Sequence, residues 1–135
     1  MKKFLSVLCL TIVVASLLTA AAPTPNVTFT LVQGLPSTMN VGDTYTVMVQ
    51  VESDQQFLYA QALPSFYYPG RGVVAVRGGD HVGSGTTATL EITYTAKGPT
   101  TKMPDGIVPV HFVAGVRYQG GYVAMQDFLF NVSVP

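Results

Sequence analysis

The chain contains two histidines, and these are its first candidates for metal binding or proton transfer. Asp80 and His81 are adjacent in a glycine-flanked segment, and Asp105 or Asp127 could add a ligand to a weak metal site there. A zinc site, however, needs three or four ligands that converge on one point. We therefore favour a solvated loop pair at Asp80-His81, and we predict no metal and no cofactor.

The other polar residues show no pattern that supports catalysis. His111 alternates onto the same face as Arg117, which predicts a surface or cross-strand residue. Ser84 lies between two glycines, without the elbow motif that exposes a catalytic serine. Glu52 and Glu91 fall in polar-face or strand-end patterns and do not form the facing pair that glycoside hydrolysis requires. We predict that the protein is not an enzyme and has no catalytic residue.

Aromatic side chains offer a different chemistry, because a planar ring can stack on a sugar ring. The chain has no tryptophan, which weakens this interpretation. We favour a structural role for the aromatic residues, at the edge of the core and in hairpins. A small carbohydrate-binding module with a polysaccharide ligand is an alternative. The residues concerned are Tyr59, Phe66, Tyr67, Tyr68, Tyr118 and Tyr122.

Two short motifs match the acceptor sequence for N-glycosylation. They are Asn26-Val27-Thr28 and Asn131-Val132-Ser133, so Asn26 and Asn131 are candidate glycan sites in an exported chain. Chance occurrence of so short a motif is the alternative.

The N-terminus predicts export. Lys2 and Lys3 precede an uncharged run at residues 4–22 that ends in three alanines, which is the pattern of a signal peptide. We place the signal-peptide helix at 1–21 and a proline-rich spacer at 22–25. The run is also close to the minimum length that spans a bilayer, so an uncleaved N-terminal anchor is the alternative and would be the protein's only contact with a membrane. In both cases we predict an extracellular or cell-envelope location.

Composition indicates one small domain after the signal peptide. Removal of 1–21 takes away Cys9, the only cysteine, so no disulfide can form. About 114 of the 135 residues remain, and a chain of that length buries roughly 65% of its unfolded surface, enough for one core. The seven Lys and Arg residues balance seven Asp and Glu; without Lys2 and Lys3 the count is five against seven, a net charge of −2. This balance excludes a face for nucleic acid.

Apolar and polar residues alternate in seven segments separated by turn-forming residues, which is typical of an antiparallel β-sandwich. In the segment 107–118 the even-numbered residues share one apolar face, and Gly120-Gly121 supplies the positive φ angles of a following hairpin. The predicted strands are 26–33, 43–52, 56–62, 73–76, 87–96, 107–118 and 122–134.

Three stretches follow the phrasing of a known class of domain: NVGDTYTVMVQV at 40–51, TATLEI at 87–92, and PDG at 104–106 with VRYQGGY at 116–122. They resemble prokaryotic extracellular immunoglobulin-like domains, of the CARDB type and the S-layer-associated type. The resemblance covers nearly the whole chain after the signal peptide. It implies an all-β fold, a seven-stranded immunoglobulin-like β-sandwich at 26–135, and a structural or adhesive role at the cell surface.

Two regions are candidate interaction sites. The strand at 26–33 presents Val27, Phe29 and Leu31 at a sheet edge, in a chain with few charged residues to protect such edges. A glycine-rich turn after Pro64 carries an aromatic cluster. Its candidate residues are Phe66, Tyr67, Tyr68 and Arg71.

These regions predict a secreted or cell-surface domain that acts through a protein partner or self-association. One alternative is a subunit of a filament assembled by donor-strand exchange, because the proline spacer and a flexible link at 34–42 would let the strand 26–33 pair with a neighbouring subunit. Pairing of that strand within its own domain is the simpler expectation.

Overall fold

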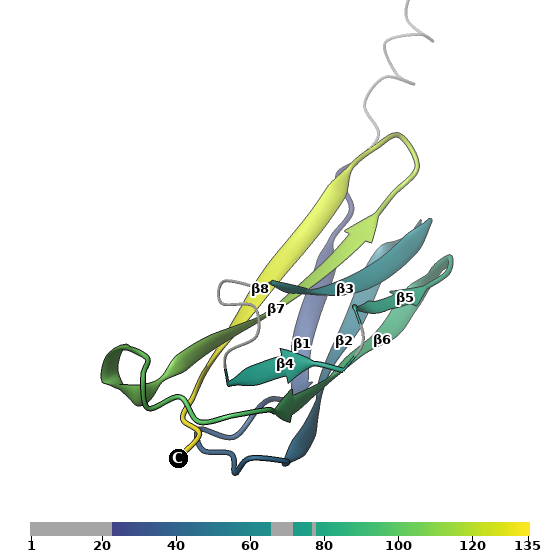
Figure 1. Cartoon of the computed structure of the whole chain (residues 1–135). Coiled ribbons are helices and arrows are strands. Elements are labelled where there is room, and N and C mark those ends of the chain that lie inside the picture. Colours follow the sequence, from purple (N-terminus) through teal and green to yellow (C-terminus); the bar gives the residue numbers. More distant parts are fainter. Residues whose placement is uncertain (1–22, 66–71, 77) are drawn as a thin grey trace, which may run out of the picture.

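The computed structural model describes residues 23–65, 72–76 and 78–135, which form two antiparallel four-stranded sheets packed as a β-sandwich (Figure 1). This confirms the predicted all-β sandwich; the predicted signal peptide at 1–21 lies outside the described residues. No helix in the described part of the chain has the length and hydrophobicity to cross a membrane. The strands are β1 (Val27–Gln33), β2 (Thr44–Phe57), β3 (Tyr59–Ser65), β4 (Val73–Ala75), β5 (Asp80–Val82), β6 (Gly85–Ala96), β7 (Val108–Arg117) and β8 (Val123–Val132).

Eight strands are present in these residues, so the predicted number of seven is wrong. The additional strand, β5, lies in a segment whose flanking glycines led us to assign a loop. It pairs antiparallel with β3, with His81 opposite Gln61. Strand β2 also extends beyond its predicted end at Glu52, because its ladder with β6 is interrupted after Glu52 and resumes at Phe57. An irregularity of this kind absorbs residues that break the alternation of side chains.

The strand order is that of an immunoglobulin constant-type sandwich with one strand added. One sheet has the order β1-β2-β6-β4 and the other β5-β3-β7-β8. These orders correspond to strands A-B-E-D and C-F-G of the immunoglobulin fold, with β5 beside the equivalent of C. The fold therefore fits the immunoglobulin-like prediction.

The core lies between the inner faces of the two sheets. On β2, Val47, Val49 and Val51 are buried, as the alternation predicts, whereas Tyr45 on the same side is 37% exposed. The alternating apolar residues of β6 and β7 are buried as well. Alternation accounts for this, since every second residue of a strand points to the same side of its sheet. The largest members that are almost completely buried include Phe57, Leu90, Tyr94 and Phe112.

Tyr94 connects the two sheets through the core. Its ring lies on β6, and its hydroxyl donates a hydrogen bond to the backbone carbonyl of His111 on β7 at 3.1 Å. Burial raises the pKa of the Tyr94 phenol above its usual value. The inter-sheet contact therefore depends on a neutral phenol.

The β7-β8 hairpin forms where the adjacent glycines predicted it. Gly120 and Gly121 have φ angles of 91° and 93°, which a residue with a side chain rarely adopts. The backbone N–H of Tyr118 donates to the carbonyl of Tyr122 across the turn at 2.9 Å. The two strands then pair without a register shift over ten residues each.

The link after β1, predicted to be flexible at 34–42, is anchored instead. Met39 is fully buried in the core. The backbone N–H of Met39 donates to the carbonyl of Ser133 at 3.0 Å, and the N–H of Ser133 donates to the carbonyl of Ser37 at 2.8 Å. After β1 the link thus lies against the end of β8 in the other sheet before it continues into β2, and β1 pairs within its own domain.

Candidate interaction surface

The sandwich has two outer faces of different chemistry. The outer face of the β1-β2-β6-β4 sheet, which we call the threonine face, carries hydroxyl groups in adjacent strands. Two cross-strand pairs form hydrogen bonds, Thr44 with Thr95 at 3.2 Å and Thr46 with Thr93 at 2.9 Å. Its threonines are Thr28, Thr30, Thr44, Thr46, Thr87, Thr89, Thr93 and Thr95. These pairs leave the face polar and its hydroxyls partly satisfied.

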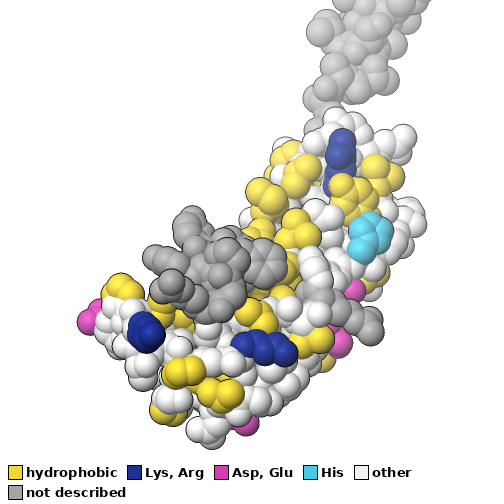
Figure 2. Space-filling model, viewed as in Figure 1, with side chains coloured by type: hydrophobic (Ala, Val, Ile, Leu, Met, Phe, Trp, Pro, Cys, Tyr) yellow, Lys and Arg dark blue, Asp and Glu magenta, His cyan; other side chains and the backbone are white. Residues whose placement is uncertain are grey.

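The outer face of the β5-β3-β7-β8 sheet is apolar over its centre, and we call it the apolar face. Met125 is 70% exposed, Leu129 53%, Leu63 48% and Val123 47%. Val113 lies beside Leu63 in the ladder and completes the patch. Figure 2, in the orientation of Figure 1, shows hydrophobic side chains gathered over the upper part of this sheet, toward the end at which the β7-β8 hairpin turns. Contiguous exposed apolar surface of this kind marks contact sites in soluble proteins.

Strand β8 carries apolar residues on both of its sides. Phe128, Phe130 and Val132 point inward, while Met125 and Leu129 point outward. A strand with water on one side normally alternates apolar and polar residues, whereas apolar residues on both sides are typical of a strand covered on both faces. Strand β8 is also the outermost strand of its sheet. Its composition therefore predicts that something covers the apolar face.

A flexible side chain covers the middle of this face. Gly115 on β7 lies opposite Met125 on β8, and a Cβ atom added at Gly115 would lie 3.3 Å from Cγ of Met125. The missing side chain thus lets Met125 lie close against the sheet. Methionine adapts its shape readily to a contacting surface.

The apolar face also carries two charged side chains, and one of them, Asp127, lies between Met125 and Leu129 on β8. Asp127 contacts Nδ1 of His111 through Oδ2 at 2.8 Å, diagonally across the β7-β8 ladder. This confirms His111 as a cross-strand residue. Arg117 is exposed at the end of β7, opposite Val123. One cation and one anion therefore accompany the apolar patch.

The residues of the weak metal site are not brought together. Asp80 accepts hydrogen bonds from the backbone N–H groups of His81 at 2.9 Å and Glu91 at 2.8 Å. The His81 ring stacks on Tyr59 with centroids 5.1 Å apart. Asp127 contacts His111 rather than His81. The described residues contain no group of three or more metal-ligating side chains that could hold an ion.

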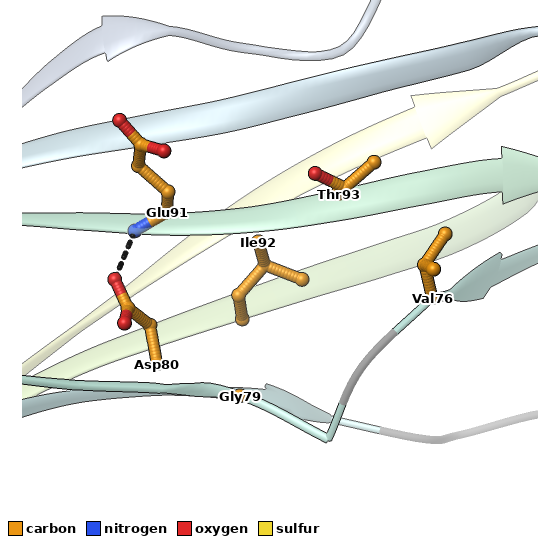
Figure 3. Close-up of a pocket in the computed structure, with 6 residues that line it drawn as sticks. All are labelled: Val76, Gly79, Asp80, Glu91, Ile92 and Thr93. Atoms are coloured by element: carbon orange, nitrogen blue, oxygen red, sulfur yellow. Dashed lines mark hydrogen bonds between the residues drawn. The ribbon is translucent and has the colours of Figure 1, made fainter.

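Asp80 instead connects the two sheets by a hydrogen bond from β5 to the backbone of β6, close to the end of β4. A hollow of about 380 Å³ lies there, lined by Val76, Gly79, Asp80, Glu91, Ile92 and Thr93. The backbone N–H of Val76 donates to the carbonyl of Thr93, and the carboxylate of Asp80 accepts the N–H of Glu91. Figure 3 shows Asp80 reaching the backbone of Glu91 while the Glu91 side chain points away. Beyond the end of β4, the Asp80 carboxylate thus accepts a backbone N–H of β6 that a neighbouring strand would otherwise bind. Nothing in the sequence indicated this role.

The predicted strand-edge residues lie where the alternation placed them. Strand β1 is the edge of its sheet. Val27 and Phe29 are half-buried against the core, and Leu31 is exposed. The other predicted interaction residues, Phe66, Tyr67, Tyr68 and Arg71, lie outside the described residues.

The two candidate glycan acceptors differ in their surroundings. Asn26 donates from its side-chain Nδ2 to Oδ2 of Asp54 at 3.2 Å, and its backbone N–H donates to Oδ1 at 2.8 Å. Asn131 is exposed on the outer side of β8, opposite Pro109. A glycan on Asn26 would have to replace the side-chain contact with Asp54.

The tyrosines do not form a common stacking platform among the described residues. Tyr118 is buried, and its hydroxyl lies 2.6 Å from Oγ of Ser53. Tyr122 lies beside Tyr118 in a tilted arrangement, and Tyr59 is stacked on His81. The arrangement fits the structural role that we favour for these three rings.

Comparison with known proteins gives no family. No protein-family model matches the chain, and no curated protein matches it. Among solved structures, the native conformation of alpha-2-macroglobulin from E. coli is 20% identical, with a TM-score of 0.47, over 85% of this chain. The chain spans only 7% of that protein. A similarity this low carries no argument, so the surface chemistry must indicate the function.

Proposed function

We propose that this protein is an exported, non-catalytic immunoglobulin-like domain with a structural or adhesive role, and that it acts through protein contacts made by its apolar face. The single observation that carries the proposal is the outward apolar side of β8. Met125 and Leu129 are more than half exposed on a strand whose inward side already packs on the core. The signal-peptide pattern at 1–21 and the resemblance to CARDB-type and S-layer-associated domains support export and a surface role.

The energetics favour the apolar face over the threonine face as the contact surface. Burial of a large apolar side chain that is half exposed contributes about 1 kcal/mol. The apolar face presents several such side chains, whereas the hydroxyls of Thr46 and Thr93 already bond each other. Covering those hydroxyls would remove their contacts with water for little gain. The partner is therefore expected to present a flat, largely uncharged apolar protein surface.

The placement of the acidic residues supports a non-catalytic role. Asp80 binds backbone N–H groups, and Asp127 contacts His111 on a strand surface. Glu52 and Glu91 lie on the threonine face, opposite Thr87 and Met48 in the ladder. General acid-base chemistry needs such groups to face a substrate site.

Photo-cross-linking in the exporting cells tests this proposal. Met125 is replaced by a photoreactive phenylalanine analogue, and the matched control carries the same replacement at Thr89 on the threonine face. We expect protein adducts from the Met125 position in at least about tenfold higher yield than from Thr89, because only the first position lies within the contact surface. Equal yields at the two positions would contradict the proposal.

Strand exchange is a second candidate, and the burial of β1 favours it. No residue of β1 is fully buried, so the strand contributes less to the core than its neighbour β2. The anchored link at Met39 limits how far β1 can move. Deletion of residues 22–33 separates the candidates: a filament subunit loses assembly, whereas a domain that binds through its apolar face keeps its partner.

A further inference from the structure

We infer that the partner of the apolar face is the same face of a second copy of this chain, in a two-fold symmetric dimer. This inference rests on the proposed function and names its partner. A largely apolar face whose described residues include one cation and one anion fits best against a surface of the same kind. Its own residues provide that surface, and their arrangement is self-complementary.

The charges of the face occupy symmetric positions along the strands. Gly115 and Met125 form one row of the β7-β8 ladder. Arg117 lies two residues from this row in one direction, and Asp127 lies two residues from it in the other. Two residues of extended strand span about 6.6 Å. A positive and a negative side chain therefore lie on either side of the neutral Gly115-Met125 row.

A two-fold axis along the Gly115-Met125 row exchanges these ends. It places Arg117 of one copy above the Val113 row of the other, next to the column that holds Asp127. Neighbouring strands are about 4.8 Å apart, a distance that the long arginine side chain bridges. Each dimer would contain two such Arg117-Asp127 contacts, because an isologous interface repeats every contact. Stacking without this reversal would oppose like charges.

The apolar residues of the face are compatible with this packing. Met125 would lie at the two-fold axis, where fully buried apolar contacts stabilise an interface, and the Arg117-Asp127 contacts would flank it. Leu129 lies two residues beyond Asp127 on β8 and would therefore lie farther from the axis. Lys97 and Lys102 lie in the segment between β6 and β7, away from the ladder rows of this face. Among the described residues of this face, Arg117 and Asp127 are the only ones of the Lys, Arg, Asp and Glu types.

The size of the face agrees with a weak dimer. Strands β7 and β8 have ten residues each, β3 has seven and β5 three. At about 3.3 Å per residue and about 4.8 Å per strand, the face offers roughly 500 Å² per copy, below the ~800 Å² per partner of a standard interface. We therefore expect weak, reversible dimers.

Charge exchange in the purified exported chain tests the inference. Light scattering and sedimentation are followed from about 1 µM to about 1 mM for the native protein, Arg117→Asp, Asp127→Arg and the double variant. Each single variant is expected to weaken the dimer at least about tenfold, because like charges then meet across the interface. The double variant is expected to restore the native dissociation constant to within about threefold. Thr89→Asp on the threonine face serves as the matched control and leaves the dimer unchanged.

Two further measurements keep a failure interpretable. Circular dichroism checks that each variant is folded, and Met125→Asp, which does not alter the Asp127-His111 contact, is expected to abolish the dimer. A native chain that stays monomeric to the highest concentration overturns the inference, as does a dimer that none of these substitutions affects. If the chain is monomeric while Met125 cross-links to a different protein, the dimer is wrong and the proposed function stands. If neither association nor cross-linking occurs, both are wrong.

Discussion

The threonine face and the apolar face belong to one sandwich and share one core, yet they present opposite chemistry to their surroundings. Threonine satisfies the preference of a strand for β-branched residues and keeps a hydroxyl for water or a neighbouring strand. Met125 and Leu129 serve strand formation no better than threonine does, and they expose large apolar surface. The difference indicates that the outward residues of a strand depend on what the strand contacts, whereas its inward residues depend on the packing of the core.

Substitution of Asp80, which connects the two sheets, is expected to have the largest effect on stability. Asp80→Ala leaves the backbone N–H of Glu91 without its acceptor, and we expect the free energy of unfolding to fall by about 1–3 kcal/mol. Hydrogen exchange at the Glu91 amide should accelerate, whereas exchange along β7 and β8 under the apolar face should not. Asp80→Asn retains an acceptor oxygen and is the control. An unchanged Glu91 exchange rate would show that Asp80 does not fasten the two sheets.

The pH dependence of stability tests the buried Tyr94, whose hydroxyl connects the two sheets beneath the two faces. The pKa of Tyr94 is raised in the folded protein above the ordinary value of 10.0. Below pH 10 the phenol is protonated in both states and its contribution to stability is complete; above pH 10 the unfolded chain releases the proton and the folded chain keeps it. The free energy of unfolding should therefore fall by about 1.4 kcal/mol per pH unit as pH rises above 10.

Denaturant titration of the native protein and Tyr94→Phe measures this effect. The variant loses the hydrogen bond to the His111 carbonyl, which lowers stability at neutral pH, but it should show a shallower decline above pH 10. Parallel declines in the two proteins would mean that Tyr94 ionises as easily in the folded state as in the unfolded one.

Exchange of side-chain chemistry between the two faces gives the smallest effect on stability and the sharpest contrast in association. Thr46→Val with Thr93→Val should change the free energy of unfolding by no more than about 0.5 kcal/mol, as surface substitutions usually do. Met125→Thr with Leu129→Thr should be equally mild for stability. Only the second pair should weaken association, measured by sedimentation. Weakening by the first pair instead would move the contact surface to the threonine face.

Much of the fold could be predicted from local patterns. The alternation in β2, β6 and β7 identified the buried residues, although it also placed the exposed Tyr45 among them, and Gly120-Gly121 identified the hairpin. Strand β5 was not predicted, because its three residues, Asp80-His81-Val82, are too few to show the alternation that identifies a strand. The prediction of a flexible link at 34–42 is wrong because Met39 is held by Ser133, which follows β8 and lies more than ninety positions later in the chain.

The apolar face left a partial signal in the sequence. Within the segment predicted at 122–134, Met125 and Leu129 alternate to one side while Phe128 and Phe130 alternate to the other. Asp127 and Asn131 share the side of Met125 and Leu129, so the signal is partial, but large apolar residues on both sides of one segment could have indicated a strand covered on both faces. The neighbours of β8 in the sheet could not be predicted, since Leu63 and Met125 lie far apart in the sequence.

The sequence by itself determined which residues point to the same side of each strand, because side-chain alternation and turn chemistry act over a few residues. Only the tertiary structure decided which strands lie next to each other and in what register. Those choices depend on closing one core between residues that are distant in the chain. They placed Leu63, Val113 and Met125 in one surface, put Arg117 and Asp127 on opposite sides of its centre, and turned Asp80 from a candidate metal ligand into a fastener between two sheets.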